Sequence, residues 1–195
     1  MTEAEMDADN EDILAPTSKT IREYVQAYPQ YVRIQLKELD PVRYESMPET
    51  LRQRKAEGEL YLVKDEVLKL VKWKLSHGKF RPNLMNLVSK NSEEVIRETT
   101  TKAFAEEDVI KGLDILTKLS GVGPATAALL LSVNSPNTVP FFSDELFRFS
   151  QLTRDGNGGV SGWDRKIAYN KKEYIGLLYS LLRGHHRDTA TNHSR

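Results

Sequence analysis

Hydrophobic residues recur at helical spacing along most of the chain. Between residues 63 and 75, Val63, Val67, Leu70 and Val71 fall on one helical face, and lysines occupy the other side. The same kind of spacing, together with glycine, proline and capping signals, predicts the remaining helices. They are expected at 20–39 with a break near Pro29, and at 48–56, 84–88, 92–104, 109–119, 125–133, 144–152 and 170–182. The pattern therefore predicts an all-α fold.

The segment 125–133 differs from the others because it is apolar nearly all round. A helix of that kind is expected at the centre of a domain, where every face is covered. The preceding segment, 109–119, has one apolar face and exposes Lys111 and Lys118. The two segments are joined by a short turn that contains two glycines and ends at Pro124. We therefore expect a pair of helices that pack closely at the centre of the domain.

Composition narrows the class of protein. The chain has 195 residues, of which 39% are hydrophobic, so it can bury one substantial core. It has no cysteine, which excludes a disulfide framework, a thiolate metal site and a cysteine nucleophile. No apolar stretch is long enough to span a bilayer, and the first residues do not resemble a secretory signal. These features predict an intracellular protein, nuclear or cytosolic and not secreted, with no membrane partner.

The formal net charge of zero conceals an asymmetry. The first twelve residues contain six acids and no lysine or arginine, which leaves an excess of six positive charges in the rest of the chain. A basic body suits a polyanionic partner, although such an excess is also common on solvated surfaces. We predict an acidic, disordered leader over 1–18, a helical domain over 19–184 and a flexible tail over 185–195. Nothing in the sequence specifies an oligomeric state.

The turn at 119–124 carries the candidate chemistry. Gly121 and Gly123 permit backbone angles that other residues adopt only at a cost, and Pro124 suits the first position of a helix. The N–H groups of Val122, Gly123 and Ala125 would then point outward at the positive end of the second helix. Such a helix start binds phosphate groups readily. The alternative is an ordinary helix end followed by a turn without a ligand.

These residues resemble a helix-hairpin-helix motif, here at about 109–133. The order Leu119-Ser-Gly-Val-Gly, an apolar helix, and then Val139-Pro-Phe-Phe-Ser-Asp144 is similar to that of the helix-hairpin-helix superfamily of base-excision DNA glycosylases. Asp144 follows Gly123 by twenty-one residues, close to the family's spacing. The resemblance covers roughly 64–152 and is strong only over 119–149. It implies a DNA glycosylase-like fold that binds DNA through the phosphate backbone.

The resemblance also implies a reaction and an ion. In the family, the aspartate stabilises positive charge on the sugar as the base departs, and that role would fall on Asp144. Members that also cut the strand carry a lysine where this chain has Ala125, so no Schiff-base lyase activity is expected from that position. No side-chain metal site or other cofactor is expected. Hairpin carbonyls would hold a potassium or sodium ion by analogy.

Several basic residues are candidate phosphate contacts: Lys118 beside the hairpin, and Lys79 and Arg81 in the stretch 72–81. The competing interpretation of Asp144 is a helix N-cap, which either it or Ser143 could provide. The function is therefore predicted as DNA binding, with monofunctional base excision as its enzymatic form. A DNA-binding or scaffold module without chemistry and a helical protein-interaction domain are the alternatives.

Overall fold

The computed structural model describes residues 18–78, 81–154 and 160–190. Within these ranges the α-helices are α2 (Ser18–Tyr31), α3 (Met47–Ala56), α4 (Lys64–His77), α5 (Pro82–Ser89), α6 (Glu93–Phe104), α7 (Val109–Leu116), α8 (Pro124–Asn134), α9 (Asp144–Ser150) and α10 (Lys171–Ala190). A 3-10 helix, η2 (Ile34–Leu36), and a π-helical turn, η3 (Val42–Ser46), lie between α2 and α3. The predicted all-α class is confirmed, in a single domain.

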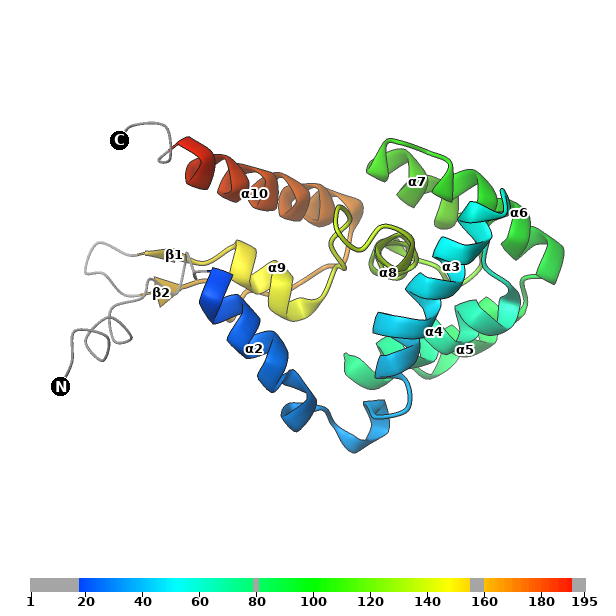
Figure 1. Cartoon of the computed structure of the whole chain (residues 1–195), viewed down its shortest axis with the longest axis horizontal. Helices are drawn as coiled ribbons and strands as arrows, with labels where there is room; N and C mark the ends of the chain where they lie inside the picture. Colours follow the sequence, from blue (N-terminus) through cyan, green and yellow to red (C-terminus); the bar gives the residue numbers. More distant parts are fainter. Residues whose placement is uncertain (1–17, 79–80, 155–159, 191–195) are drawn as a thin grey trace.

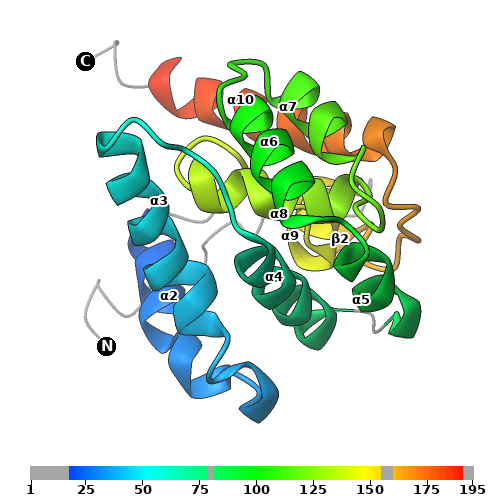
Figure 2. The same ribbon diagram turned by 90° about the vertical axis from the view of Figure 1, so that its right-hand side faces the viewer.

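Helix α8 forms the centre of the domain. All nine of its residues from Ala125 to Val133 are buried, as the apolar sequence predicts. It packs against α3, α4, α6, α7 and α10. Figures 1 and 2 show it between α4 on one side and α10 on the other. Because α8 packs against five other helices, the position of its first turn is fixed by the core of the domain.

Two predicted helix starts are capped as their sequences indicate. The Ser92 hydroxyl accepts a hydrogen bond from the Val95 N–H at 3.2 Å and begins α6. The Asp108 carboxylate accepts from the Ile110 N–H at 2.8 Å and begins α7. Helices α6 and α7 then pack against each other and against α8. These caps fix where the first arm of the hairpin begins.

Helix α2 differs from the rest because none of its residues is buried. It includes Pro29, which the sequence placed at a break, and continues to Tyr31. Its apolar face is largely exposed, with Tyr24 at 71% and Val25 at 67% exposure. The spacing of apolar residues predicts this helix correctly because that spacing follows the helical repeat. It does not report what covers the apolar face.

The ends of several elements differ from the sequence-based prediction. Helix α7 ends at Leu116, since the last turn before the hairpin is not helical. Two-residue strands, β1 (Thr153–Arg154) and β2 (Val160–Ser161), pair antiparallel in a part of the chain where the sequence predicts no strand. Helix α10 extends past Gly184 to Ala190, into the predicted tail. One glycine lowers helix propensity without preventing continuation. Ser18, predicted as the last residue of the leader, begins α2, and the rest of the leader, 1–17, lies outside the described residues.

Across the described ranges, no helix combines the length and the apolar character needed to cross a membrane.

Candidate nucleic-acid interface

The hairpin between α7 and α8 is built around Gly121. This residue has φ +76°, in the left-handed region that favours glycine. A Cβ at this position would lie 2.8 Å from Leu87 Cβ and 2.9 Å from Val88 Cγ2, so α5 packs directly on the turn. Leu119 and Val122 are buried on the core side. The glycine therefore allows both the reversal of the chain and the close approach of α5.

Gly123 has a different role, as the residue that caps α8. Its backbone is extended, with φ −92° and ψ 178°, and a Cβ here would meet nothing within 4 Å. Pro124 follows as the first residue of the helix, as predicted. Gly123 is exposed, so its main chain is accessible to a ligand.

The set of available amides is smaller than the sequence predicted. The Val122 N–H donates to the Leu119 carbonyl at 3.1 Å, so it belongs to the turn itself and is not a free donor. That part of the prediction was wrong, because the tight turn folds the chain back within hydrogen-bonding reach of Leu119. The N–H groups of Gly123 and Ala125 have no acceptor within the described part of the chain. These two amides remain the candidate phosphate donors.

A residue that sequence reasoning missed fastens the hairpin to the domain. The Asn91 side chain is buried; its Oδ1 accepts from the Ser120 N–H at 2.9 Å, and its Nδ2 donates to the Ser120 carbonyl at 3.0 Å. The side-chain amide of Asn91 therefore binds both the backbone N–H and the backbone carbonyl of Ser120. An asparagine between two helices carries no sequence signal for this contact, since the partners are twenty-nine residues apart.

A cavity of about 410 Å³ opens beside the start of α8. Its lining includes Gly123 and Ala125 from the hairpin, Asp144 from α9 and Arg81 from the turn before α5. Phe141 and Phe142 are among the residues that line it, and Phe142 and Phe147, 1% and 2% exposed, belong to the core, so the cavity is the space that these rings leave open. The volume lies within the range of ligand sites, about 300–1,000 Å³. The structure thus brings the hairpin amides and Asp144 to one cavity.

Asp144 is not the helix cap. The Ser143 hydroxyl accepts from the Leu146 N–H at 3.0 Å and caps α9. The Asp144 carboxylate instead accepts from the Tyr169 hydroxyl, which lies 2.7 Å from Oδ1 and 2.9 Å from Oδ2. Arg148 Nη2 lies 3.9 Å from Oδ2. The carboxylate therefore has a fixed position on the cavity wall, where it can interact with a ligand.

Tyr169 is the second residue of the site that the sequence did not indicate. It has φ +57°, an uncommon value for a residue with a side chain. Burial and the hydrogen bond to Asp144 raise its pKa to about 12. The Arg81 guanidinium carbon lies 5.4 Å from the centre of its ring. Tyr169 therefore links the aspartate to a candidate phosphate contact.

Lys74, on α4, also lines the cavity. Burial lowers the pKa of Lys74 and the nearby Arg81 lowers it further, whereas Asp144 acts in the opposite direction. The sequence placed Lys74 in a basic stretch but gave no reason to single it out. A helical wheel positions the lysine on a face, and only the packing of α4 against α8 shows that this face borders the cavity.

The predicted phosphate contacts separate in the structure. Arg81 lines the cavity with the hairpin. Lys118 is exposed and borders a different depression, with Thr99 and Lys102, so the structure does not bring it to the cavity. Lys79 lies outside the described residues. Arg33, which was not predicted, lines the cavity instead.

The resemblance implies a potassium or sodium ion, which would need free carbonyl oxygens in the hairpin. The Gly121 and Val122 carbonyl oxygens accept no hydrogen bond from the described residues, so they are the groups that would ligate potassium or sodium. The ion stays a prediction. In the described ranges no group of three or more metal-ligating side chains occurs.

No protein-family model, curated protein or solved structure matches this chain. The resemblance to helix-hairpin-helix glycosylases therefore rests on its own motif.

Proposed function

We propose that the protein binds DNA by holding a backbone phosphate at the start of α8. The observation that carries the proposal is that Gly123 and Ala125, whose amides have no acceptor among the described residues, line a cavity that also gathers basic side chains. Amide donors at the positive end of a helix favour an anion. Contacts of this kind involve no base, so binding is expected to be independent of sequence.

Gly123→Glu tests this proposal. The position is open and its φ is negative, so the substitution is compatible with the fold, but it places a carboxylate beside the proposed phosphate. We expect affinity for a short duplex, measured by fluorescence anisotropy at low salt, to fall by roughly 10-fold or more. Gly123→Ala is the matched control and should keep most of the affinity. Equal binding by Gly123→Glu and the wild type would reject the hairpin as the phosphate site. If the wild-type protein does not bind a duplex at all, the protein-interaction alternative is favoured.

Base excision is the second candidate function, and one observation favours it. Ser143 caps α9, so the Asp144 carboxylate is not used as a cap, and the Tyr169 hydroxyl holds it at the cavity. A carboxylate in that position is suited to stabilise positive charge that develops on a sugar. The reaction would be hydrolysis, with water as the co-substrate.

Asp144→Asn is the corresponding test. With duplexes that each carry one deaminated or alkylated base, the wild type should release a base that is detected by alkaline cleavage of the strand. The variant should lose roughly 10²–10³-fold of that rate while still binding DNA. Wild-type protein that releases no base from any duplex of the panel would contradict excision and leave the non-catalytic DNA-binding module.

A further inference from the structure

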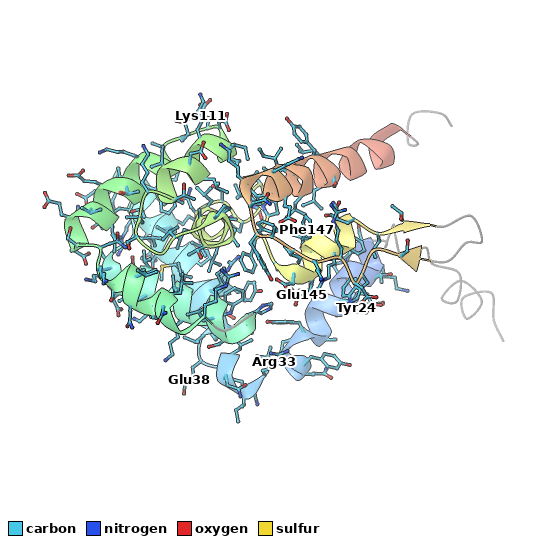
Figure 3. The ribbon with its side chains drawn as sticks, turned by 180° about the vertical axis from the view of Figure 1, so that it is seen from behind. Tyr24, Arg33, Glu38, Lys111, Glu145 and Phe147 are labelled. Carbon is cyan, nitrogen blue, oxygen red and sulfur yellow. The ribbon has the colours of Figure 1, made fainter. Side chains whose placement is uncertain are left out.

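Four arginine and lysine side chains line the cavity beside His77, and these four come from different segments. Arg33 precedes η2, Lys74 lies on α4, Arg81 precedes α5 and Arg148 lies on α9. Figure 3 labels Arg33 and Glu145, which both line the cavity. Residues so far apart in the sequence meet only through the tertiary fold. The cluster is therefore a property of the site, unlike a run of charges along one helix.

Some cations of the protein are paired with carboxylates. Arg54 pairs with Glu66 through two hydrogen bonds, and Lys171 Nζ lies 2.6 Å from Asp114. Within the described residues, by contrast, the side chains of Arg33, Lys74 and Arg81 form no ion pair or hydrogen bond, and Arg81 contacts the ring of Tyr169.

Arg148 is only partly satisfied. Among the described residues its ion-pair partner is Asp144, at 3.9 Å, and its buried Nε has no hydrogen-bond partner there. Buried polar atoms are nearly always hydrogen-bonded, so this guanidinium nitrogen, on a residue that lines the cavity, is available to an acceptor that the described residues do not supply.

The charges on the cavity wall do not balance. Four arginine or lysine side chains face two carboxylates, Asp144 and Glu145. A hydrogen bond from the neutral Tyr169 hydroxyl leaves the charge of Asp144 in place, so the two carboxylates supply two negative charges against four positive ones. Burial lowers the pKa of Lys74 and the nearby charge of Arg81 lowers it further, as expected where two cations line one cavity. The excess of two positive charges matches a dianion.

We infer that the cavity binds the terminal phosphate of a DNA strand, a phosphate monoester at a strand end. The inference rests on the proposed DNA binding and names which part of the DNA enters the cavity. A phosphate monoester carries nearly two negative charges at pH 7, whereas an internal phosphodiester carries one. A neutral nucleobase would leave the four cations desolvated without an anion, which is costly. The hairpin amides would hold the adjoining backbone phosphate.

The experiment compares short duplexes of one sequence that end in a 5′-phosphate, a 3′-phosphate or only hydroxyl groups. A hydroxyl-ended duplex one base pair longer controls for total charge. We expect one phosphorylated end to bind roughly 10-fold or more tightly than both hydroxyl-ended duplexes. The preferred end identifies the polarity of the strand. Equal binding of all duplexes would overturn the inference but leave DNA binding intact, whereas no binding of any duplex would overturn both.

Variants of the cavity sharpen the result. Arg81→Gln should reduce the preference for the phosphorylated end to about the hydroxyl level while retaining most of the hydroxyl-ended affinity. Arg81 is exposed, so this variant is expected to fold. Lys102→Gln, on α6 and outside the cavity, is the matched control for loss of one positive charge. An end preference that survives Arg81→Gln and Arg33→Gln together would contradict the assignment to this cavity.

Lys74→Met should separate binding from stability. The ordinary lysine pKa is 10.5 and the folded state lowers it, so the unfolded chain binds this proton more tightly. Protonation therefore favours unfolding as pH falls from that value, and at neutral pH the charged amine destabilises the fold. We expect Lys74→Met to raise Tm by about 2–4 °C while weakening the end preference. A variant with lower Tm and unchanged end preference would contradict a ligand-binding role for this lysine.

Discussion

Gly121→Ala is expected to destabilise the protein by about 2–5 kcal/mol. A left-handed backbone at a residue with a Cβ costs ~1–2 kcal/mol, and forcing extra atoms into a packed contact costs a further ~1–3 kcal/mol. Both costs apply here, since φ is +76° and the new carbon would lie 2.9 Å from the Val88 backbone nitrogen. The free energy of unfolding from urea denaturation measures the effect.

Gly123→Ala is the control two residues away. Its backbone is extended and the space around it is open, so the unfolding free energy should change by less than about 0.5 kcal/mol. The contrast separates the two glycines by role, one structural and one exposed to a ligand. Comparable destabilisation by both variants would contradict the hairpin geometry.

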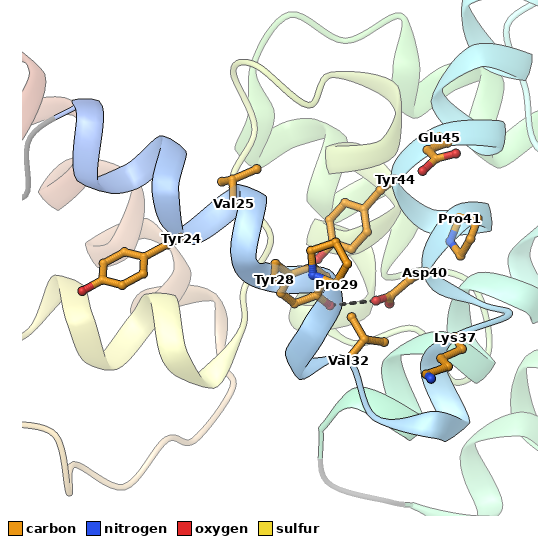
Figure 4. A pocket seen from close by; sticks show the side chains of 10 residues that line it. All are labelled: Tyr24, Val25, Tyr28, Pro29, Val32, Lys37, Asp40, Pro41, Tyr44 and Glu45. Atoms are coloured by element: carbon orange, nitrogen blue, oxygen red, sulfur yellow. Dashed lines mark hydrogen bonds between the residues drawn. The ribbon is translucent and has the colours of Figure 1, made fainter.

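Asp40→Ala is expected to cost about 3 kcal/mol of stability. Asp40 is 8% exposed, and its carboxylate accepts from Trp73 Nε1 at 2.6 Å and from the Tyr28 hydroxyl at 2.8 Å, the contact drawn in Figure 4. Its charge also acts on buried Arg43. Truncation would leave the buried indole N–H unpaired and the guanidinium without that anion, and such losses are large. Urea denaturation followed by tryptophan fluorescence measures the change.

Asp40→Asn provides the comparison. An amide oxygen can still accept from the Trp73 indole, but the negative charge beside Arg43 is lost. We expect a smaller loss than for alanine. If alanine costs no more than asparagine, then the hydrogen bond to Trp73 contributes little, and the account of this buried group is incorrect.

The elements governed by local physics were predictable from the sequence. An all-round apolar segment predicts a buried central helix, and α8 is that helix. Ser92 caps α6 because its side chain and the following acids provide the chemistry of a helix start. Local rules left open whether Ser143 or Asp144 caps α9. The answer depends on which of the two side chains is bound by a residue from elsewhere in the chain. Tyr169 engages Asp144, and Ser143 caps the helix.

The candidate site was less accessible to sequence reasoning because its residues come from separate segments. Nothing near Arg33 or Tyr169 in the chain indicates that both border the start of α8. Lys118 is close to the hairpin in sequence, yet it lies in the turn after α7 and borders a different depression. The Val122 amide was misassigned because the register of hydrogen bonds within a tight turn is decided by backbone angles, which glycine leaves variable.

The central claim is that the unpartnered amides at the start of α8 contact DNA. The most direct measurement is a two-dimensional amide NMR titration of the protein with a short duplex at low salt. We predict that the Gly123 and Ala125 amide signals shift strongly and lose their shifts as salt is raised, while the Val122 amide, bonded to Leu119, shifts less. Shifts confined to other faces, with the Gly123 and Ala125 signals unmoved at saturating DNA, would contradict the account.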